Sequence, residues 1–126
     1  MPRARAYRRR VCHYVPVTDR AERIVRNEIL FREVNEQVES LSTASSPGQS
    51  FPAVCECGSG ECSDVIRIDW ADYEAVRAHA ERFLVTPGHE IEEVEDLIEQ
   101  HDTFSVVAKK PGAPRELAAA TDLRSP

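Results

Sequence analysis

The sequence predicts an α+β protein, with a long N-terminal helix followed by a small module of short strands and one or two helices. Three observations support this fold class. An amphipathic helix pattern occupies residues 19–42, and short β-prone runs alternate with turn signals from residue 53 onward. Three cysteines also gather in the segment CECGSGEC, residues 55–62, which indicates a local constraint on the module.

The composition fits one globular domain with a modest core. The chain has 126 residues, of which 41% are hydrophobic, 30% charged and only 6% aromatic. Few large aromatic side chains are available to fill a core, so an additional cross-link would stabilise the fold. The net charge is −6, and the first ten residues hold five arginines and no acid, so removing those five charges leaves about −11 for the rest. Such an acidic body would repel nucleic-acid phosphates, and any such contact would fall to the arm.

The first elements are a basic arm with an extended lead-in over residues 1–18 and an amphipathic helix over residues 19–42. Asp19 is the expected N-cap, with Glu22 three residues later in capping-box position. Apolar residues recur along one stripe of this helix, with Asn27 in its one polar position; they are Ile24, Phe31, Val34, Val38 and Leu41. The stripe resembles a coiled-coil seam but is short, which favours a helix packed on its own domain over a dimer or a partner helix.

A linker rich in Ser, Pro and Gly is expected over residues 43–52, followed by a module over residues 53–110. The module begins with an extended entry, a thiol loop and a strand over residues 65–68. A helix should follow Asp69 as its N-cap; its shared side would hold Trp70, Tyr73, Val76, Ala80 and Phe83. The run FLV is a brief extended segment, and Pro87 and Gly88 suit the centre of a type II turn.

Residues 91–100 fit two structures. Ile91, Val94, Leu97 and Ile98 have helical spacing and many glutamates surround them, so a helix is favoured. A hairpin with its turn at His101 is the alternative. The run FSVVA is a strand in either case, and residues 111–126 are expected to be a loosely attached tail.

No apolar run approaches the ~20 residues that span a bilayer, so we expect a cytoplasmic protein without membrane contact. In a reducing compartment, clustered cysteines bind metal or perform redox chemistry more often than they form structural disulfides.

The spacing C-x-C-x4-C suits a structural zinc site, because soft thiolates are favoured zinc ligands in a tetrahedral shell. Both Cys55 and Cys57 can bind only if Glu56 points away, and we expect it to point to solvent. Gly58 and Gly60 are expected to adopt positive φ, which would turn the chain back to Cys62 and aim amide N–H groups at the sulfurs.

The fourth zinc ligand has several candidates, namely Cys12, His13, His79, His89 and His101. His79 lies off the apolar side of its helix, and His101 lies in a turn beside Asp102, so both suit a solvent-facing role. His89 directly follows the Pro-Gly turn and should lie beside the strand that leaves the thiol loop. We therefore assign Cys55, Cys57, Cys62 and His89 to Zn²⁺, with Cys12 or His13 as the alternative fourth ligand.

Other hypotheses for the role of the thiols have less support. A redox couple of Cys55 and Cys57, with Cys62 resolving, would suffer from nearby acidic residues that raise thiol pKa values. An iron–sulfur cluster would need the distant Cys12, and plain packing lacks apolar neighbours. The chain has no P-loop and no nucleophile elbow, and HEIEEV lacks the second histidine of a zinc protease helix. The acidic run after His89 is a solvated surface, so we expect no enzyme.

Several segments together resemble a family of small, functionally uncharacterised proteins of high-GC Gram-positive bacteria. They are RNEILFREVNEQVESL, VCECGSGEC followed by DYEAVRAHAERFLVTPGHE, and HDTFSVVAKK with the closing ATDLRS. The resemblance runs over about residues 20–125 and excludes the arginine arm. It implies that Cys55, Cys57, Cys62 and His89 belong together, and that a β-hairpin surrounds His101. It leaves Cys12 outside the shared pattern and implies no activity.

The sequence thus predicts a non-enzymatic zinc-binding protein of regulatory or adaptor type. A protein partner would contact the helix face of Ile24, Phe31, Val34 and Val38, and a homodimer would use the same face. A nucleic-acid-associated zinc protein is the alternative, and its contacts would come from Arg5, Arg8, Arg9 and Arg10. A thiol-redox protein is the third hypothesis.

Overall fold

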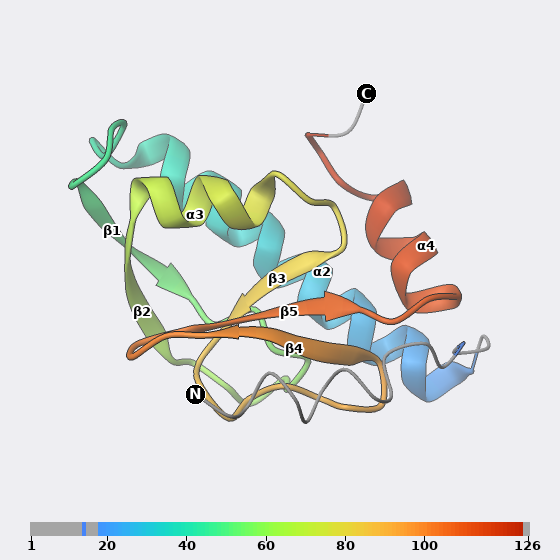
Figure 1. Cartoon of the computed structure of the whole chain (residues 1–126). Helices are drawn as coiled ribbons and strands as arrows, with labels where there is room; N and C mark the ends of the chain where they lie inside the picture. The colour runs from blue at the N-terminus through green and yellow to red at the C-terminus, as the bar shows by residue number, and fades with distance from the viewer. Residues whose placement is uncertain (1–13, 15–17, 125–126) are drawn as a thin grey trace.

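Three helices and five strands make up the part of the chain that the structure describes. The structure is a computed structural model, and it describes Tyr14 and residues 18–124. In chain order the elements are α2 (Asp19–Leu41), β1 (Ser50–Val54), β2 (Val65–Asp69), α3 (Trp70–Arg77), β3 (Arg82–Val85), β4 (Glu95–Gln100), β5 (Ser105–Lys109) and α4 (Ala113–Ala120). Figure 1 shows their arrangement. The predicted α+β class with a long N-terminal helix is confirmed.

The strands form two antiparallel sheets. One sheet pairs β1 with β2, and the other has the order β3-β5-β4. The register of the first sheet places Phe51 opposite Ile68 and Ala53 opposite Ile66, and all four side chains are buried. Ile66 and Ile68 therefore share the inner face of β2, because alternate residues of a strand point to the same side.

The N-cap of helix α2 lies one residue earlier than the sequence suggested. The N-cap is Thr18, whose side-chain oxygen accepts a hydrogen bond from the backbone N–H of Ala21 at 3.0 Å. Asp19, the expected cap, instead lies in the first turn together with Glu22. Both carboxylates are favourable there because they face the positive end of the helix dipole.

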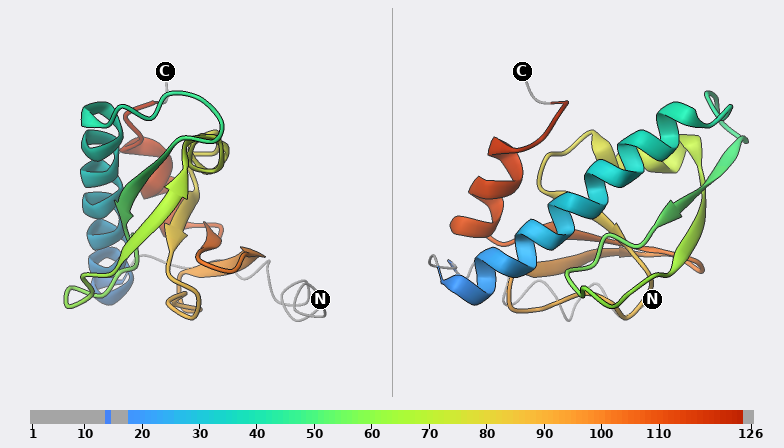
Figure 2. Two further views of the ribbon diagram at one scale, coloured as in Figure 1. Left: turned by 90° about the vertical axis from the view of Figure 1, so that its left-hand side faces the viewer. Right: turned by 180° about the vertical axis from the view of Figure 1, so that it is seen from behind.

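Helix α2 packs on the body of the protein and is not a separate appendage. It lies along one side of the strands, as the two views of Figure 2 show, and contacts β1 and α4. The expected loose tail also differs from the structure, because residues 113–120 form α4. Pro114 and Ala118 of α4 are buried against the rest of the chain.

The buried face of α2 is rotated from the predicted apolar stripe. Ile24 is buried, but Val34 is 37% exposed and Leu41 is 84% exposed. The inner face instead carries polar side chains at a spacing of four and three residues; they are Glu28, Arg32 and Asn35. Hydrophobic periodicity placed the stripe wrongly because it treats such side chains as solvent-facing.

Each buried polar side chain of α2 binds a different element. Arg32 donates hydrogen bonds to the carbonyl oxygens of Ala80 at 2.6 Å and Ala118 at 2.9 Å. Its guanidinium also lies 4.3 Å from the centre of the Phe83 ring. The Ala118 carbonyl belongs to the last turn of α4, where carbonyl groups lack helical partners. Arg32 therefore joins α2 to α4 and to the start of β3.

Glu28 takes part in a fully buried ion cluster. The Lys109 amine of β5 lies 2.7 Å from Glu28 Oε1 and also contacts the Glu95 carboxylate of β4, and all three side chains are 0% exposed. Burial raises the pKa of Glu28 well above its usual range, although Lys109 opposes the shift. Burial also tends to raise the pKa of Glu95. The charge of Lys109 and the hydrogen bonds that Glu95 makes outweigh this effect, so its pKa is lowered.

Residues 95–100 form a strand, so the favoured helix over residues 91–100 is wrong and the hairpin alternative is confirmed. β4 pairs with β5 in antiparallel register, from Glu95 opposite Lys109 to Gln100 opposite Ser105. The inward positions of β4 are Glu95 and Leu97, while Ile98 is 37% exposed. The sequence of β4 does not show the alternation of apolar and polar residues that is typical of a strand, because Glu95, which pairs with Lys109, occupies an inward position.

Helix α3 begins as predicted but is shorter. Asp69 is its N-cap and accepts a hydrogen bond from Ala71 N at 2.8 Å. The helix ends at Arg77, so Phe83, which was assigned to the same helix side, lies in β3. The described helices include none that is long and apolar enough to cross a membrane.

Replacing Lys109 with Met should destabilise the protein by about 3–5 kcal/mol, because two buried carboxyl groups would lose their cation. Urea unfolding measures the loss. The control is Arg20→Met, which removes an exposed ion pair with Glu93 and should cost less than about 1 kcal/mol. Equal losses in the two variants would contradict the expected cost of leaving the two buried carboxyl groups without a cation.

Candidate metal centre

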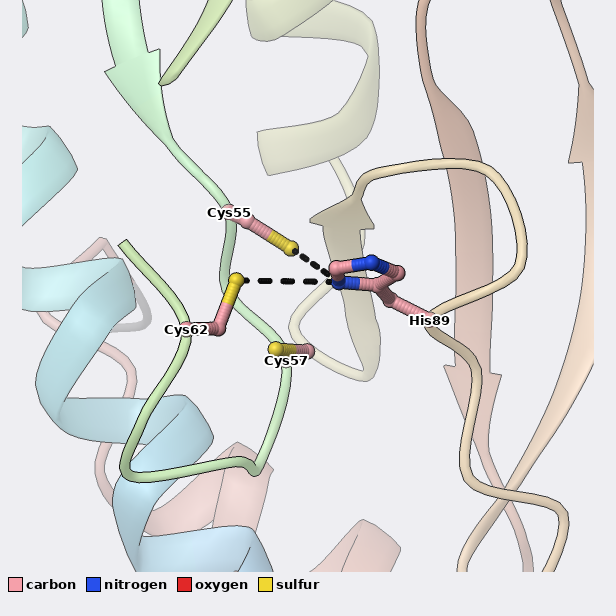
Figure 3. Close-up of side chains that lie close together, drawn as sticks. All are labelled: Cys55, Cys57, Cys62 and His89. Carbon is pink, nitrogen blue, oxygen red and sulfur yellow. Dashed lines mark hydrogen bonds between the residues drawn. The ribbon is translucent and has the colours of Figure 1, made fainter. Parts of the chain in front are cut away.

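The thiol loop connects β1 and β2 and is held by the sheet at its base. Backbone pairing continues one step past β1, because Cys55 N donates to the carbonyl oxygen of Asp64 at 3.0 Å. Cys55 and Cys57 are buried, and Cys62 is half-buried on the returning arm of the loop. Figure 3 shows the three cysteines gathered around His89.

His89 is positioned by the turn between β3 and β4. The backbone N–H of His89 donates to the Thr86 carbonyl oxygen at 2.9 Å, which closes the turn, and Gly88 has φ of +91°. A type II turn needs positive φ at its third position, where glycine is favoured. The predicted Pro-Gly turn is thus present, and it directs the imidazole toward the thiol loop.

The four side chains form a compact set of ligand atoms. The three sulfurs and one ring nitrogen all lie within 4.8 Å of one another. Nδ1 of His89 lies 3.6 Å from Cys55 Sγ and 3.6 Å from Cys62 Sγ. With Zn–S bonds of about 2.3 Å and Zn–N bonds of about 2.0–2.1 Å, sulfur and nitrogen ligands of a tetrahedral site lie about 3.6 Å apart. This cluster can therefore hold a metal ion.

The other histidines in the described part of the chain lie elsewhere. His79 is exposed, as expected. His101 is exposed in the β4–β5 hairpin, where its Nε2 lies 2.9 Å from Glu99 Oε1 and its ring stacks on Phe104 with 4.3 Å between centres. Cys12 and His13, the alternative fourth ligands, lie outside the described residues.

The local environment disfavours free thiolates. Burial raises the pKa of Cys57 to about 12, against an opposing hydrogen bond from the backbone of Ser59. Burial also raises the pKa of Cys55, although Thr86 N donates a hydrogen bond to its sulfur at 3.1 Å. Reactive cysteines need a lowered pKa, whereas a bound cation would stabilise both thiolates directly.

Glu56 does not point to solvent, so that prediction is wrong. Its side chain is 0% exposed, and its two carboxylate oxygens accept hydrogen bonds from Asn35 Nδ2 at 2.7 Å and Leu84 N at 2.9 Å. Burial raises the pKa of Glu56, and these two hydrogen bonds act in the opposite direction. The sequence alone did not reveal these contacts, because Asn35 and Leu84 come from distant segments.

The glycines of the thiol loop also have roles other than those expected. Among the described residues, positive φ is found at Gly48, Gly88 and Gly112, and not at Gly58 or Gly60. A Cβ atom at Gly58 would lie 2.5 Å from Cγ2 of Ile24 on α2. Gly58 is therefore required by close packing, and its carbonyl oxygen accepts a hydrogen bond from Asn27 at 3.1 Å.

The second nitrogen of His89 faces a carboxylate. Nε2 lies 3.6 Å from Oδ2 of Asp64, and the two side chains are 35% and 50% exposed. In metal sites, a carboxylate beside the free ring nitrogen fixes the orientation of a ligating histidine. Cys57, Cys62 and His89 also line an open cleft together with Ser59 and Asp64, which gives an ion a path from solvent.

Comparison with known proteins does not add a function. No family model, curated protein or solved structure matches the chain. The resemblance noted in the sequence stays a prediction.

Metal affinity should fall as the pH is lowered from 8.5 to 7. Because burial keeps the pKa of Cys55 and Cys57 high, an ion must displace a proton from each thiol. The protons displaced from these two thiols alone change the binding constant by about a hundredfold per pH unit. Competition with a chelator of known pH dependence measures this slope, and an affinity that is constant over this range would contradict protonated thiols in the metal-free site.

Proposed function

We propose that the protein is a non-enzymatic zinc-binding module in which Cys55, Cys57, Cys62 and His89 hold one structural Zn²⁺. The observation that carries this proposal is the convergence of three sulfurs and one imidazole nitrogen within 4.8 Å. The donors come from two segments, the β1–β2 loop and the β3–β4 turn. An ion bound to all four would cross-link the two sheets of the fold.

The donor set favours zinc over other metals. Three thiolates and one imidazole are a common ligand set of structural zinc, whereas magnesium and calcium prefer oxygen donors. An iron–sulfur cluster is usually held by four cysteines, and the described cluster offers three.

A structural role is supported by the number of protein ligands. Catalytic zinc sites keep a coordination position open for water or substrate, and they commonly use three protein ligands. Here four protein donors are present, which fills a tetrahedral shell. The free energy of binding would then contribute to folding, because the unfolded chain does not keep the four donors together.

Location in the cytoplasm belongs to the same proposal. Thiolate ligands must stay reduced, and a reducing compartment favours this. The redox alternative has less support, because the raised pKa values of Cys55 and Cys57 lower their reactivity as nucleophiles.

A partner on the α2 face or on the arginine arm remains a prediction. Ile24, one residue of the expected partner face, is part of the protein's own core, and Phe31 and Val38 are half-buried. A protein partner or a second copy on that face would therefore rely mainly on Val34. The arginine arm, on which nucleic-acid binding depends, lies outside the described residues.

Purified protein should contain about one zinc ion per chain by elemental analysis, and Cys57→Ser should lose it. Removing the ion should lower the free energy of unfolding by about 4 kcal/mol if zinc is present at about a thousand times its Kd. Thermal unfolding with and without a chelator measures this change. The control is Cys12→Ser, which should retain zinc.

Two results would contradict the proposal. One is a wild-type protein that contains no zinc and does not take it up. The other is a protein whose unfolding temperature is unchanged after zinc has been removed.

A further inference from the structure

The pair Cys55 and Cys57 can bind one ion only if both sulfurs face the same way. In an extended chain, side chains of residues i and i+2 lie on one face and the side chain between them lies on the other. Figure 3 shows Cys55 and Cys57 on the chain segment that leaves β1, with both near His89. The direction of Glu56 therefore decides the direction of the two sulfurs.

Glu56 is held on the opposite side by both its backbone and its side chain. Its N–H donates to the carbonyl oxygen of Leu84 at 2.8 Å, and Leu84 N donates to Glu56 Oε1 at 2.9 Å. This reciprocal pair joins the thiol loop to β3. The free edge of β3 is used here, because β5 occupies its other edge.

Asn35 of α2 holds the second oxygen of Glu56. Its Nδ2 donates to Glu56 Oε2 at 2.7 Å and to the Val54 carbonyl oxygen at 2.8 Å, while its Oδ1 accepts from Val54 N at 2.7 Å. The backbone N–H of Val54 is a donor, which fixes the orientation of the Asn35 amide. Asn35 therefore presents a donor to Glu56 and cannot turn over without losing both contacts to Val54.

We propose that Glu56 is a positioning residue that orients Cys55 and Cys57 for metal binding and sets the affinity of the site, an inference that rests on the proposed zinc centre. The three hydrogen bonds that hold Glu56 involve only protein groups from β3 and α2. None of these hydrogen bonds needs an ion, so we expect the metal-free protein to have the two sulfurs already on the side of His89. Preorganisation of this kind raises affinity, because less ordering is needed at binding.

The test compares Glu56→Gln with Glu61→Gln in the full chain. Both oxygens of Glu56 face donors, but glutamine has one acceptor, so its amide NH₂ would face either Leu84 N–H or Asn35 Nδ2. Glu61 is an exposed acid of the same loop and is the matched control. The probe is Co²⁺, whose thiolate charge-transfer and tetrahedral ligand-field absorption report on coordination.

Glu56→Gln should weaken Co²⁺ binding by about 10–100-fold, the range found when groups that orient metal ligands are changed. Glu61→Gln should bind as the wild type does. Circular dichroism of the metal-free variants checks that they are folded. A folded Glu56→Gln protein with wild-type affinity and spectrum would overturn the proposal.

Two further outcomes separate the inference from the proposed function. If the wild type gives no tetrahedral Co²⁺ spectrum, the zinc site itself fails and Glu56 has no ligands to position. If Glu56→Gln does not fold, hydrogen exchange of the metal-free wild type decides. Protection of Leu84 N–H, which is bonded to Glu56 and not to β5, supports preorganisation, and rapid exchange at Leu84 would overturn it.

Discussion

The contact between Asn35 and the β1 exit is the constraint on which the site depends. One amide side chain from α2 satisfies the backbone of Val54 and the carboxylate of Glu56 together. Such a buried amide must use its donors and acceptor in one arrangement, because unpaired polar groups in the interior are costly. This requirement fixes the position at which the thiol loop leaves β1. The loop then lies against α2, where Gly58 permits the approach to Ile24.

Helix α2 organises the fold through polar contacts that its sequence pattern conceals. Glu28, Arg32 and Asn35 lie on the same face and bind β5, α4 and the thiol loop, respectively. Each contact is specific in geometry, whereas an apolar stripe would allow the helix to slide or rotate. Buried polar and charged groups that lose their partners are costly, so a position of the helix that breaks these contacts is disfavoured. We therefore attribute the position of α2 on the strands to these three side chains.

The sequence predicted the donors of the site better than their support. Cysteine spacing and the Pro-Gly turn before His89 are local signals, and the structure brings these four side chains together. Glu56 was misplaced because its partners are distant in the chain and a polar residue in a polar loop suggests solvent exposure. Likewise, the spacing over residues 91–100 favours a helix because Glu95 occupies an inward position of β4 that hydropathy assigns to the surface. Both errors share one cause, which is that charged side chains can be buried when tertiary partners form hydrogen bonds or ion pairs with them.

The protein builds the scaffold of the site, and a bound ion would complete it. Hydrogen bonds from α2 and β3 orient the thiol loop, and the β3–β4 turn supplies the imidazole. X-ray absorption at the zinc edge of the purified protein tests this central claim most directly. We predict a first shell of three sulfurs at about 2.3 Å and one nitrogen at about 2.0–2.1 Å. A shell with fewer sulfurs, or one filled by oxygen donors, would contradict it.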